Sequence, residues 1–400
     1  MRDKSDICIV GAGLLGSALA LYLAKHTSYK ITLFERTQPL EHPQYANQRV
    51  LALGEVAANF LSDISVFQFL NSDRSHAYDR MCVWDQNSVG QLNFCADEIG
   101  KKQLGWIVDA QYLSYKLQQQ VLESAAVDCR FLCELESLQW LDAQNSSQAT
   151  RPTLSYISQN GEMHSHQSRL MIAADGARSW LRNAAKIFSN RFDYNQQGIV
   201  ALIKTDSHHN DCAWQRFLEH GPLALLPVAD GHCSIVWSAD TEQSHDLLAM
   251  SDRNFEVALE QAIENRLGNI SLCSQRQTFP LNSSRASRYY SNNLALVGDA
   301  AHSIHPLAGQ GANLGFKDIS CLGRLLRESK PEQLGDTDNL VRYQRLRQAD
   351  NHQTDSLMTF LHRAYANQHP LWTPLRGFGM NLIDRTDFLR RLLAQQAMGL

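Results

Sequence analysis

The chain has 400 residues, of which 44% are hydrophobic and 20% charged, a composition typical of a globular protein with two or three domains. The formal net charge is -4 and the sequence contains no block of like charge, which argues against a nucleic-acid partner. Nine cysteines are scattered without a CxxC pair, so we expect reduced thiols in a cytoplasmic protein rather than a disulfide framework.

The first 35 residues follow a strand, glycine-rich turn, helix and strand pattern. A short apolar strand is expected at Asp6–Val10, a helix at Ser17–Lys25 and a second strand at Lys30–Glu35. This order is typical of the start of a doubly wound parallel sheet. A signal peptide over Ile7–Ala24 is the alternative, but three regularly spaced glycines interrupt that apolar run and would serve no purpose in one.

The turn between these elements carries the spacing GxGxxG. Gly11 permits a tight turn, Gly13 lets a pyrophosphate approach the backbone, and Gly16 lets the helix pack closely on the strand. The helix N-terminus offers free N–H groups to the phosphates. Glu35, at the end of the second strand, is suited to ribose hydroxyls and would repel a 2′-phosphate. These features predict a bound dinucleotide, FAD or NAD.

The middle of the chain changes from the helical to the extended pattern. A hairpin is expected over Met81–Phe94, a helix over Asp109–Glu123 and a buried strand over Leu170–Ala174. Residues 186–282 contain short apolar runs between polar turns, which predict a mixed or antiparallel sheet. The strands expected there are Ile199–Lys204, Leu223–Pro227 and Cys233–Trp237.

Two further turns follow expected strands. Asp175-Gly176 comes directly after Leu170–Ala174, where an ordinary turn is the alternative to a ligand site. Gly298-Asp299 ends an expected strand at Leu294–Val297, and an acid in that position can hold sugar hydroxyls. A loop rich in glycine then leads into a helix expected over Gly311–Leu326, whose N-terminus can face an electron-rich ring.

The remaining features have simpler explanations. His302 and His305 lie three residues apart, but no further ligand cluster accompanies them, so we expect a hydrogen-bonding role and no metal. The chain after about residue 335 reads as helical. Asp384–Leu400 is amphipathic and basic, and either packs on its own domain or rests on an anionic membrane or a partner. No segment after the N-terminal run approaches the roughly 20 apolar residues of a membrane span.

The order of GxGxxG, Asp-Gly and Gly-Asp resembles the single-component flavoprotein monooxygenases. GDAAHSIHPLAGQGANLGFKD closely resembles the ubiquinone-biosynthesis hydroxylases, and WDQNSVGQLNF, ADGARSWLRN, CSIVWS and QAMGL resemble their 2-polyprenylphenol hydroxylase branch. The resemblance implies an α/β fold with a Rossmann-like FAD-binding domain of the para-hydroxybenzoate hydroxylase type. That domain would comprise 1–80, 100–185 and 283–330, with a smaller substrate domain of 81–99 and 186–282 and a helical region of 331–400.

The resemblance also assigns roles by position. The residues expected at the reacting end of the flavin are Pro306, Gly309, Gln310 and Gly311. The residues expected to hold FAD are Gly11, Gly13, Gly16, Glu35, Arg36, Arg49, Gln111, Asp175, Gly176, Gly298, Asp299, Gly311, Ala312 and Asn313. Asp175 and Gly176 would also meet the NAD(P)H. The family's Glu-Asn pair is replaced here by Asp109-Ala110-Gln111, which puts the flavin contact of Gln111 in question.

The implied reaction is hydroxylation of a polyprenylphenol or quinol ring in ubiquinone biosynthesis. Noncovalent FAD would be reduced by a visiting NAD(P)H, and a flavin C4a-hydroperoxide formed with O2 would transfer one oxygen atom. The single GxGxxG fits a nucleotide that does not stay bound. A biosynthetic complex and peripheral contact with the inner membrane are expected partners of a cytoplasmic enzyme. The alternatives are a prenyl reductase or halogenase of the same fold, and a non-catalytic FAD-binding subunit.

Overall fold

The computed structural model describes residues 3–43, 49–70, 73–142, 150–304, 310–366, 372–386 and 390–391. His305, Pro306 and Gly309 therefore lie outside the described residues, as does most of the amphipathic segment Asp384–Leu400. Within the described part of the chain, no helix is both long enough and apolar enough to cross a membrane.

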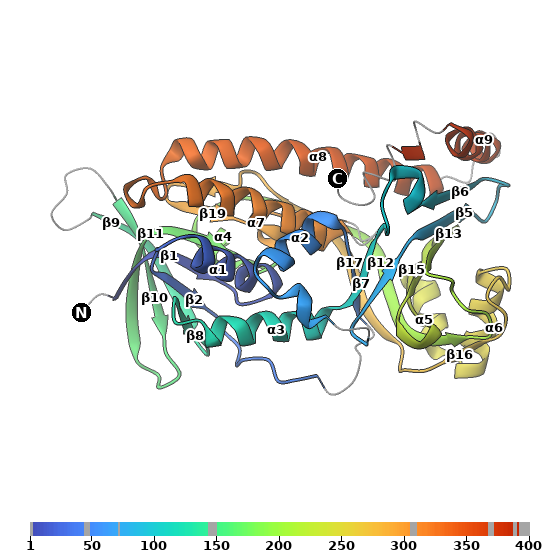
Figure 1. Ribbon diagram of the computed structural model, residues 1–400, viewed down its shortest axis with the longest axis horizontal. Coiled ribbons are helices and arrows are strands. Elements are labelled where there is room, and N and C mark those ends of the chain that lie inside the picture. Colours follow the sequence, from blue (N-terminus) through green and yellow to red (C-terminus); the bar gives the residue numbers. More distant parts are fainter. Residues whose placement is uncertain are drawn as a thin grey trace.

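A parallel sheet forms the centre of the larger half of the molecule (Figure 1). Its parallel strands are β19 (Leu294–Leu296), β11 (Met163–Ala173), β1 (Asp3–Val10), β2 (Ile31–Phe34) and β8 (Val127–Arg130), in that order. The last four residues of β1 and all of β2 are buried, as expected for strands covered on both faces. Helix α1 (Leu14–His26) connects β1 to β2, and the predicted opening unit is confirmed.

Two smaller pieces of sheet in this half have no counterpart in the sequence analysis. An antiparallel hairpin of β9 (Glu134–Asp142) and β10 (Thr150–Ile157) continues the large sheet from β11. A three-stranded sheet contains β3 (Val50–Leu53), β7 (Gly105–Asp109) and β4 (Ser75–Tyr78). The second of these holds the backbone of residues 49–53 beside the start of helix α3 (Ala110–Glu123).

The other half is a nine-stranded, largely antiparallel sheet. Its strands are β5 (Arg80–Asp85), β6 (Gln91–Cys95), β12 (Ser189–Thr205), β13 (Cys212–Leu218), β14 (Gly221–Pro227), β15 (His232–Asp240), β16 (Ile270–Leu272), β17 (Gln277–Ala286) and β20 (His302–Ser303). The predicted hairpin over Met81–Phe94 is confirmed as β5 and β6. The predicted strand Ile199–Lys204 forms part of the much longer β12, and β17 carries this sheet past residue 282.

Residues 241–249 and 252–262 are helical, so a sheet-only interpretation of 186–282 was wrong there. Helix α5 (Thr241–Ala249) begins after Asp240, whose side chain accepts a hydrogen bond from the Gln243 N–H. Helix α6 (Asp252–Ala262) begins after Ser251, which caps the Asn254 N–H in the same way. Phe255 and Leu259 of α6 are fully buried against one face of the sheet, which leaves the other face available.

The remaining helices join the two halves. Helix α7 (Gln310–Glu328) packs on α1 and on α2 (Glu55–Asp63), and the predicted helix Gly311–Leu326 is confirmed. The long α8 (Thr337–Ala366) runs over both halves, and α9 (Trp372–Arg385) lies against β6 (Figure 1). The two largest apolar cores are separate, one around the parallel sheet and one between β12–β16 and α5–α6.

Candidate active site

The GxGxxG turn is shaped by close backbone contacts. Gly11 adopts φ +102°, and a Cβ there would lie 2.5 Å from the Ala174 carbonyl oxygen. A Cβ on Gly16 would lie 1.9 Å from the Gly11 carbonyl oxygen, so this glycine is required for packing. A Cβ on Gly13, by contrast, would meet no atom within 4 Å. Gly13 therefore faces open space, as a residue beside a bound pyrophosphate should.

Two side chains fix this turn from outside it. Glu35 Oε2 accepts a hydrogen bond from the Ala12 N–H at 2.8 Å, and Glu35 Oε1 accepts from the Thr37 N–H at 3.0 Å. Gln118 of α3 donates to the Ala12 carbonyl oxygen at 2.7 Å and is buried. Glu35 is half-buried at the end of β2, where the sequence analysis placed it. Gln118 was missed because nothing near it in the sequence marks it.

The Gly298-Asp299 turn is packed against the GxGxxG helix. Gly298 has φ +57°, and a Cβ there would lie 2.2 Å from Leu15 Cδ1 of α1. A Cβ on Gly315 of α7 would lie 2.4 Å from the same atom. Glycines at both positions thus make room for Leu15, and this contact sets the distance between the two motifs.

A buried polar network lies under the Gly298-Asp299 turn. Asp318 of α7 is completely buried and accepts hydrogen bonds from the Gly298 N–H at 3.0 Å, from His302 Nε2 at 2.6 Å and from Arg347 Nε at 2.8 Å. Burial alone would raise the pKa of Asp318, but His302 and Arg347 hold it below its usual value. His302 thus has a hydrogen-bonding role. Because Arg347 lies on α8, this helix also supports the Gly298-Asp299 turn.

Asp299 itself lies on the wall of a cavity. Its carboxylate has no hydrogen-bond partner among the described residues. Burial among the surrounding protein atoms raises its pKa, while His302 and Arg49 act in the opposite direction. The side chain is nevertheless open to the cavity. An acceptor in this setting is suited to hydroxyl donors of a ligand.

The start of α7 forms the adjoining part of the wall. Gly311 and Ala312 line the cavity, and a Cβ on Gly311 would meet no atom within 4 Å. The side chain of Asn313 is buried and used within the protein. Its Oδ1 accepts from the Gly54 N–H and its Nδ2 donates to the Ala52 carbonyl oxygen, each at 2.8 Å. Asn313 therefore ties the start of α7 to β3.

The third motif is the Asp175-Gly176 turn, which is held in place by hydrogen bonds. Asp175 Oδ2 accepts a hydrogen bond from the Leu181 N–H at the start of the short helix α4 (Trp180–Ala184), and burial raises the pKa of this carboxyl group. Gly176 lines the cavity with φ +78°. Arg182 donates to the carbonyl oxygens of Ala177 and Ala300, each at 3.0 Å. Arg182, which the sequence analysis did not single out, thus joins this turn to the Gly298-Asp299 turn.

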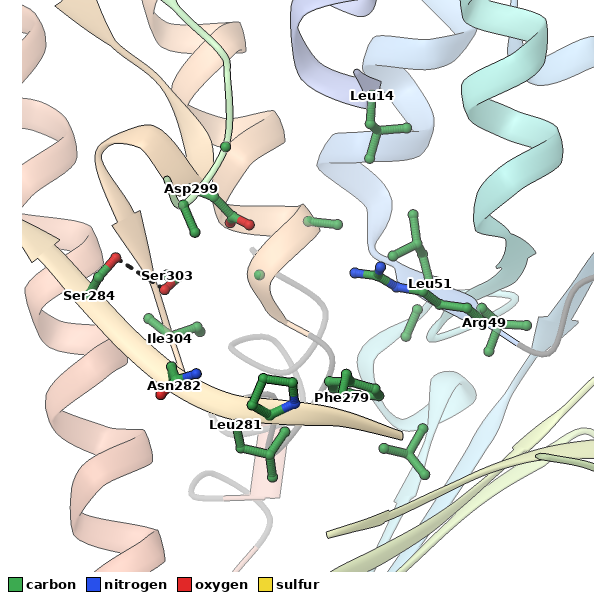
Figure 2. Close-up of a pocket in the computed structure, with 18 of the residues that line it drawn as sticks. Leu14, Arg49, Leu51, Phe279, Leu281, Asn282, Ser284, Asp299, Ser303 and Ile304 are labelled. Carbon is green, nitrogen blue, oxygen red and sulfur yellow. Dashed lines mark hydrogen bonds between the residues drawn. The ribbon is translucent and has the colours of Figure 1, made fainter. Parts of the chain in front are cut away.

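The cavity has a volume of about 810 Å³ and lies between the two halves of the molecule. Six of the predicted residues meet on its wall, namely Gly13, Arg49, Gly176, Asp299, Gly311 and Ala312. In Figure 2, Asp299 lies across the open space from Arg49 and Leu51, while the residues of β17 from Phe279 to Ser284 run along one side. The geometry thus gathers segments that are nearly 300 residues apart in the chain.

Two predicted residues lie away from the cavity wall. Gln111 and Arg36 are exposed and do not line the cavity, and the Gln111 N–H donates to Asp109 Oδ1 as part of the α3 cap. Gln310 is the first residue of α7. The roles assigned to these residues stay predictions, as do those of Pro306 and Gly309 outside the described part of the chain.

The opposite wall of the cavity comes from the nine-stranded sheet, within residues 186–282 of the expected substrate domain, although none of its residues was assigned to the site. Residues at alternate positions on three strands point into the cavity, while their neighbours enter the core with α5 and α6. The cavity-facing residues are Ala213 and Gln215 on β13, Pro222, Ala224 and Leu226 on β14, and Val236 and Ser238 on β15. Leu223 and Leu225, between them on β14, are buried in that core. This wall is mainly apolar.

Within the described residues, one group of side chains has the spacing of a metal site, formed by His76, His209 and Asp211. His209 lies 3.1 Å from both of its backbone partners. Its Nδ1 accepts from the Asp211 N–H, and its Nε2 donates to the Val228 carbonyl oxygen. Because both ring nitrogens are engaged by the backbone, the arrangement explains the cluster without a metal.

The cavity wall fits FAD. Helix α1 begins at Gly13 with no side-chain cap and no acid in its first turn, so its N–H groups and positive dipole end are available to a pyrophosphate. Asp299 offers an unpartnered acceptor for a ribityl hydroxyl, and the start of α7 offers a second helix N-terminus beside the apolar wall. Gly13 and Gly311, which lie at these two helix starts, both line the cavity at positions where an added Cβ would meet no described atom within 4 Å.

Comparisons with known proteins agree with this assignment. Residues 4–354 match the family model described as FAD binding domain. The chain is 30% identical to the 3-demethoxyubiquinol 3-hydroxylase of Escherichia coli K12 over the whole of both chains. It is also 30% identical to the mitochondrial ubiquinone biosynthesis monooxygenase COQ6 of Xenopus tropicalis, over 94% of this chain and 89% of the relative.

Solved structures share the fold at lower identity. The p-nitrophenol 4-monooxygenase PnpA of Pseudomonas putida superimposes with a TM-score of 0.78 at 15% identity, covering 100% of this chain and 99% of that one. PqsL of Pseudomonas aeruginosa, described as a probable FAD-dependent monooxygenase, superimposes with a TM-score of 0.75 at 19% identity, over 95% of this chain and all of its own.

The fold and the cavity define an FAD-dependent monooxygenase, a hydroxylase with the architecture of para-hydroxybenzoate hydroxylase. More particularly, the chain belongs to the FAD binding domain family, in the group that contains the ubiquinone-biosynthesis hydroxylases. The resemblance noted in the sequence is confirmed.

Proposed function

We propose that this enzyme hydroxylates the aromatic ring of a polyprenylphenol or polyprenylquinol intermediate in ubiquinone biosynthesis. The overall reaction converts ring C–H, O2, NAD(P)H and a proton into ring C–OH, NAD(P)+ and water. The names of the relatives support the pathway, since both act in ubiquinone biosynthesis. The branch that acts on the 2-polyprenylphenol is supported by the sequence resemblance.

The observation that carries this proposal is the apolar wall facing the Asp299 turn and the start of α7. Apolar surface gains roughly 25 cal/mol per Å² on leaving water, so a prenylated ring binds such a wall without a charged anchor. On β13, β14 and β15 the described cavity residues include no Asp, Glu, His, Lys or Arg. The wall is therefore suited to an electrically neutral, hydrophobic ring.

Bound FAD supplies the redox chemistry with NAD(P)H and O2. The chain's own residues position the ring and exclude water. Gly13 and the α1 N-terminus would hold the pyrophosphate, Asp299 the ribityl chain, and the α7 N-terminus would stabilise negative charge on the flavin. A phenol ring is already electron-rich, and we assign no side chain as general base.

The test is product identification. The purified, FAD-loaded enzyme is incubated with NADH or NADPH, O2 and a short-chain prenylphenol, and the product is analysed by mass spectrometry. We expect NAD(P)H oxidation coupled to the gain of one oxygen atom on the ring. Gain of two hydrogen atoms on the prenyl chain would support a reductase, and halide incorporation a halogenase. No turnover with any ring would support a non-catalytic subunit.

A cellular experiment tests the pathway separately from the chemistry. Cells that lack this protein should accumulate a quinone precursor missing one ring hydroxyl, and the wild-type gene should restore the quinone. Normal quinone content in such cells would overturn the pathway while leaving the hydroxylase chemistry intact.

We also propose that the enzyme meets its substrate at a membrane surface or within a biosynthetic complex. A polyprenyl tail partitions into lipid, and the basic, amphipathic sequence Asp384–Leu400 is suited to an anionic surface. Cell fractionation of the full chain and of a chain ending near Pro374 tests this. Equal membrane recovery of two FAD-loaded forms would rule out attachment through the C-terminus.

A further inference from the structure

Gln215 is a polar side chain on the mainly apolar wall, and it has no hydrogen-bond partner among the described residues. Gln215 lies on β13 at a cavity-facing position and is only 6% exposed. Its side-chain amide makes no hydrogen bond with any described residue. The neighbours on the same strand face the other side of the sheet, where Trp214 packs against the core with α6 and Arg216 donates to the Ala262 carbonyl oxygen.

The surroundings of this amide are apolar. Ala224 lies directly opposite Gln215 on β14, and Ala213 and Leu226 line the cavity nearby. The side chain is nearly buried, but its amide atoms are not among those closed off from solvent, so the amide faces the cavity. A ligand that fills the cavity would displace water from this amide, and the loss of those hydrogen bonds costs free energy unless the ligand supplies a partner.

The chemistry of the amide limits the class of ligand that it can bind. A glutamine side chain has one carbonyl acceptor and two N–H donors, so it can both accept from and donate to a neutral hydroxyl group. It carries no charge to neutralise a carboxylate, and the cavity-lining residues of β13–β15 include no cation. The arginines that line the cavity, Arg49, Arg178, Arg182 and Arg191, lie on other segments. Beside the Gln215 amide, a phenolic hydroxyl therefore fits better than a carboxylate.

We propose that Gln215 is the specificity-determining residue that binds the ring hydroxyl of the substrate, and that it selects a neutral prenylated phenol over the corresponding hydroxybenzoate. This inference rests on the proposed function and extends it to the chemical class of the ring. Gln215 would fix the ring against the apolar wall and so decide which ring edge faces the α7 N-terminus.

The experiment compares ligands on the FAD-loaded enzyme. Ortho-prenylphenol, prenylbenzene and the corresponding prenylated hydroxybenzoate are titrated while the flavin absorbance is followed. We expect the wild-type enzyme to bind the phenol more tightly than either of the other two. In Q215M, which replaces the amide by an apolar chain of similar length, the affinity for the phenol should fall about threefold to tenfold, the range for one neutral hydrogen bond. The affinity for prenylbenzene should stay unchanged.

A matched control is Q197M on β12 of the same sheet, because Gln197 does not line the cavity. It should keep the wild-type preference for the phenol. Wild-type preference in an FAD-loaded Q215M would overturn the inference. If Q215M failed to bind FAD, Q215L would decide in its place, and failure of both to bind FAD would show that Gln215 supports the fold instead.

The outcome separates this inference from the proposed function. A wild-type enzyme that hydroxylates ortho-prenylphenol but shows the same preference as Q215M refutes the role of Gln215 alone. A wild-type enzyme that binds and hydroxylates only the hydroxybenzoate refutes both.

Discussion

The wall of the cavity at the flavin site includes glycines and the starts of two helices, whereas the opposite wall consists of side chains from a sheet. We call the first the backbone wall and the second the side-chain wall. On the backbone wall, Gly13, Gly176 and Gly311 line the cavity, and a single added carbon at Gly16 or Gly298 behind it would collide with a neighbour. On the second wall, alternate residues of β13–β15 present their side chains to the cavity. We therefore expect changes on the first wall to affect the fold or the cofactor, and changes on the second to affect the substrate.

The sharpest test of the backbone wall compares two glycines of the same turn. Gly16→Val should prevent formation of a folded, FAD-loaded protein, because a Cβ at residue 16 would lie 1.9 Å from the Gly11 carbonyl oxygen. Gly13→Val should fold but bind FAD much more weakly, since its side chain would occupy the space meant for the pyrophosphate. Circular dichroism and FAD content per chain report the two effects separately. Full FAD content in Gly13→Val would refute the assigned site.

The next largest effect is expected at the network beneath the Gly298-Asp299 turn. Asp318→Asn leaves Arg347 buried without its main partner, which should lower the free energy of unfolding by about 3–5 kcal/mol. Asp350→Asn is the control, because Asp350 contacts the same Arg347 from a partly exposed position and should cost only about 1 kcal/mol or less. Urea denaturation at neutral pH measures both. Equal effects of the two substitutions would contradict a special role for Asp318.

The stability difference between the wild type and Asp318→Asn should also depend on pH. The pKa of Asp318 is lowered in the folded state, so its carboxylate stabilises the fold above its ordinary pKa of 3.8. That contribution is lost as the pH falls below 3.8 and through the folded-state pKa. The difference in stability between the wild type and Asp318→Asn should therefore be constant near neutral pH and shrink in acid. A difference that grew in acid would show that the network acts by another mechanism.

The smallest effect is expected on the side-chain wall. Ala224→Leu fills part of the cavity and should raise the KM for a prenylphenol by about tenfold, with FAD content and stability nearly unchanged. Its neighbour Leu225 faces the core with α5 and α6, so Leu225→Ala should instead lower the free energy of unfolding by about 2–5 kcal/mol. Steady-state kinetics and thermal denaturation distinguish the two. Loss of FAD in Ala224→Leu would contradict the assignment of this residue to the side-chain wall.

The two walls also differ in how far the sequence predicts them. The GxGxxG and Gly298-Asp299 turns were found because their requirements are local, and a glycine at a fixed offset from a strand is visible in the sequence. Their supports were not found, because Gln118 meets Ala12 across 106 positions and Arg182 meets Ala300 across 118. Contacts between residues so far apart in the chain leave no periodic pattern in the sequence.

The individual residues of the side-chain wall were not assigned to the site for a different reason, although a substrate domain was expected there. A strand with one solvent-exposed face shows alternating polar and apolar residues, but β14 packs one face on helices and turns the other to an apolar cavity. Leu223 to Leu226 are therefore all apolar, and the alternation is hidden. Helices α5 and α6, by contrast, could have been found from their N-caps Asp240 and Ser251.

The alternation along β13 and β14 has a consequence for how such an enzyme can change. Because the residues that define the cavity are interleaved with those that hold the sheet to α5 and α6, a mutation at one position need not disturb the other set. Selection can then alter ring preference in single steps while the protein keeps its stability. The same separation defines a compact library for directed evolution, with randomised codons confined to Ala213, Gln215, Pro222, Ala224 and Leu226.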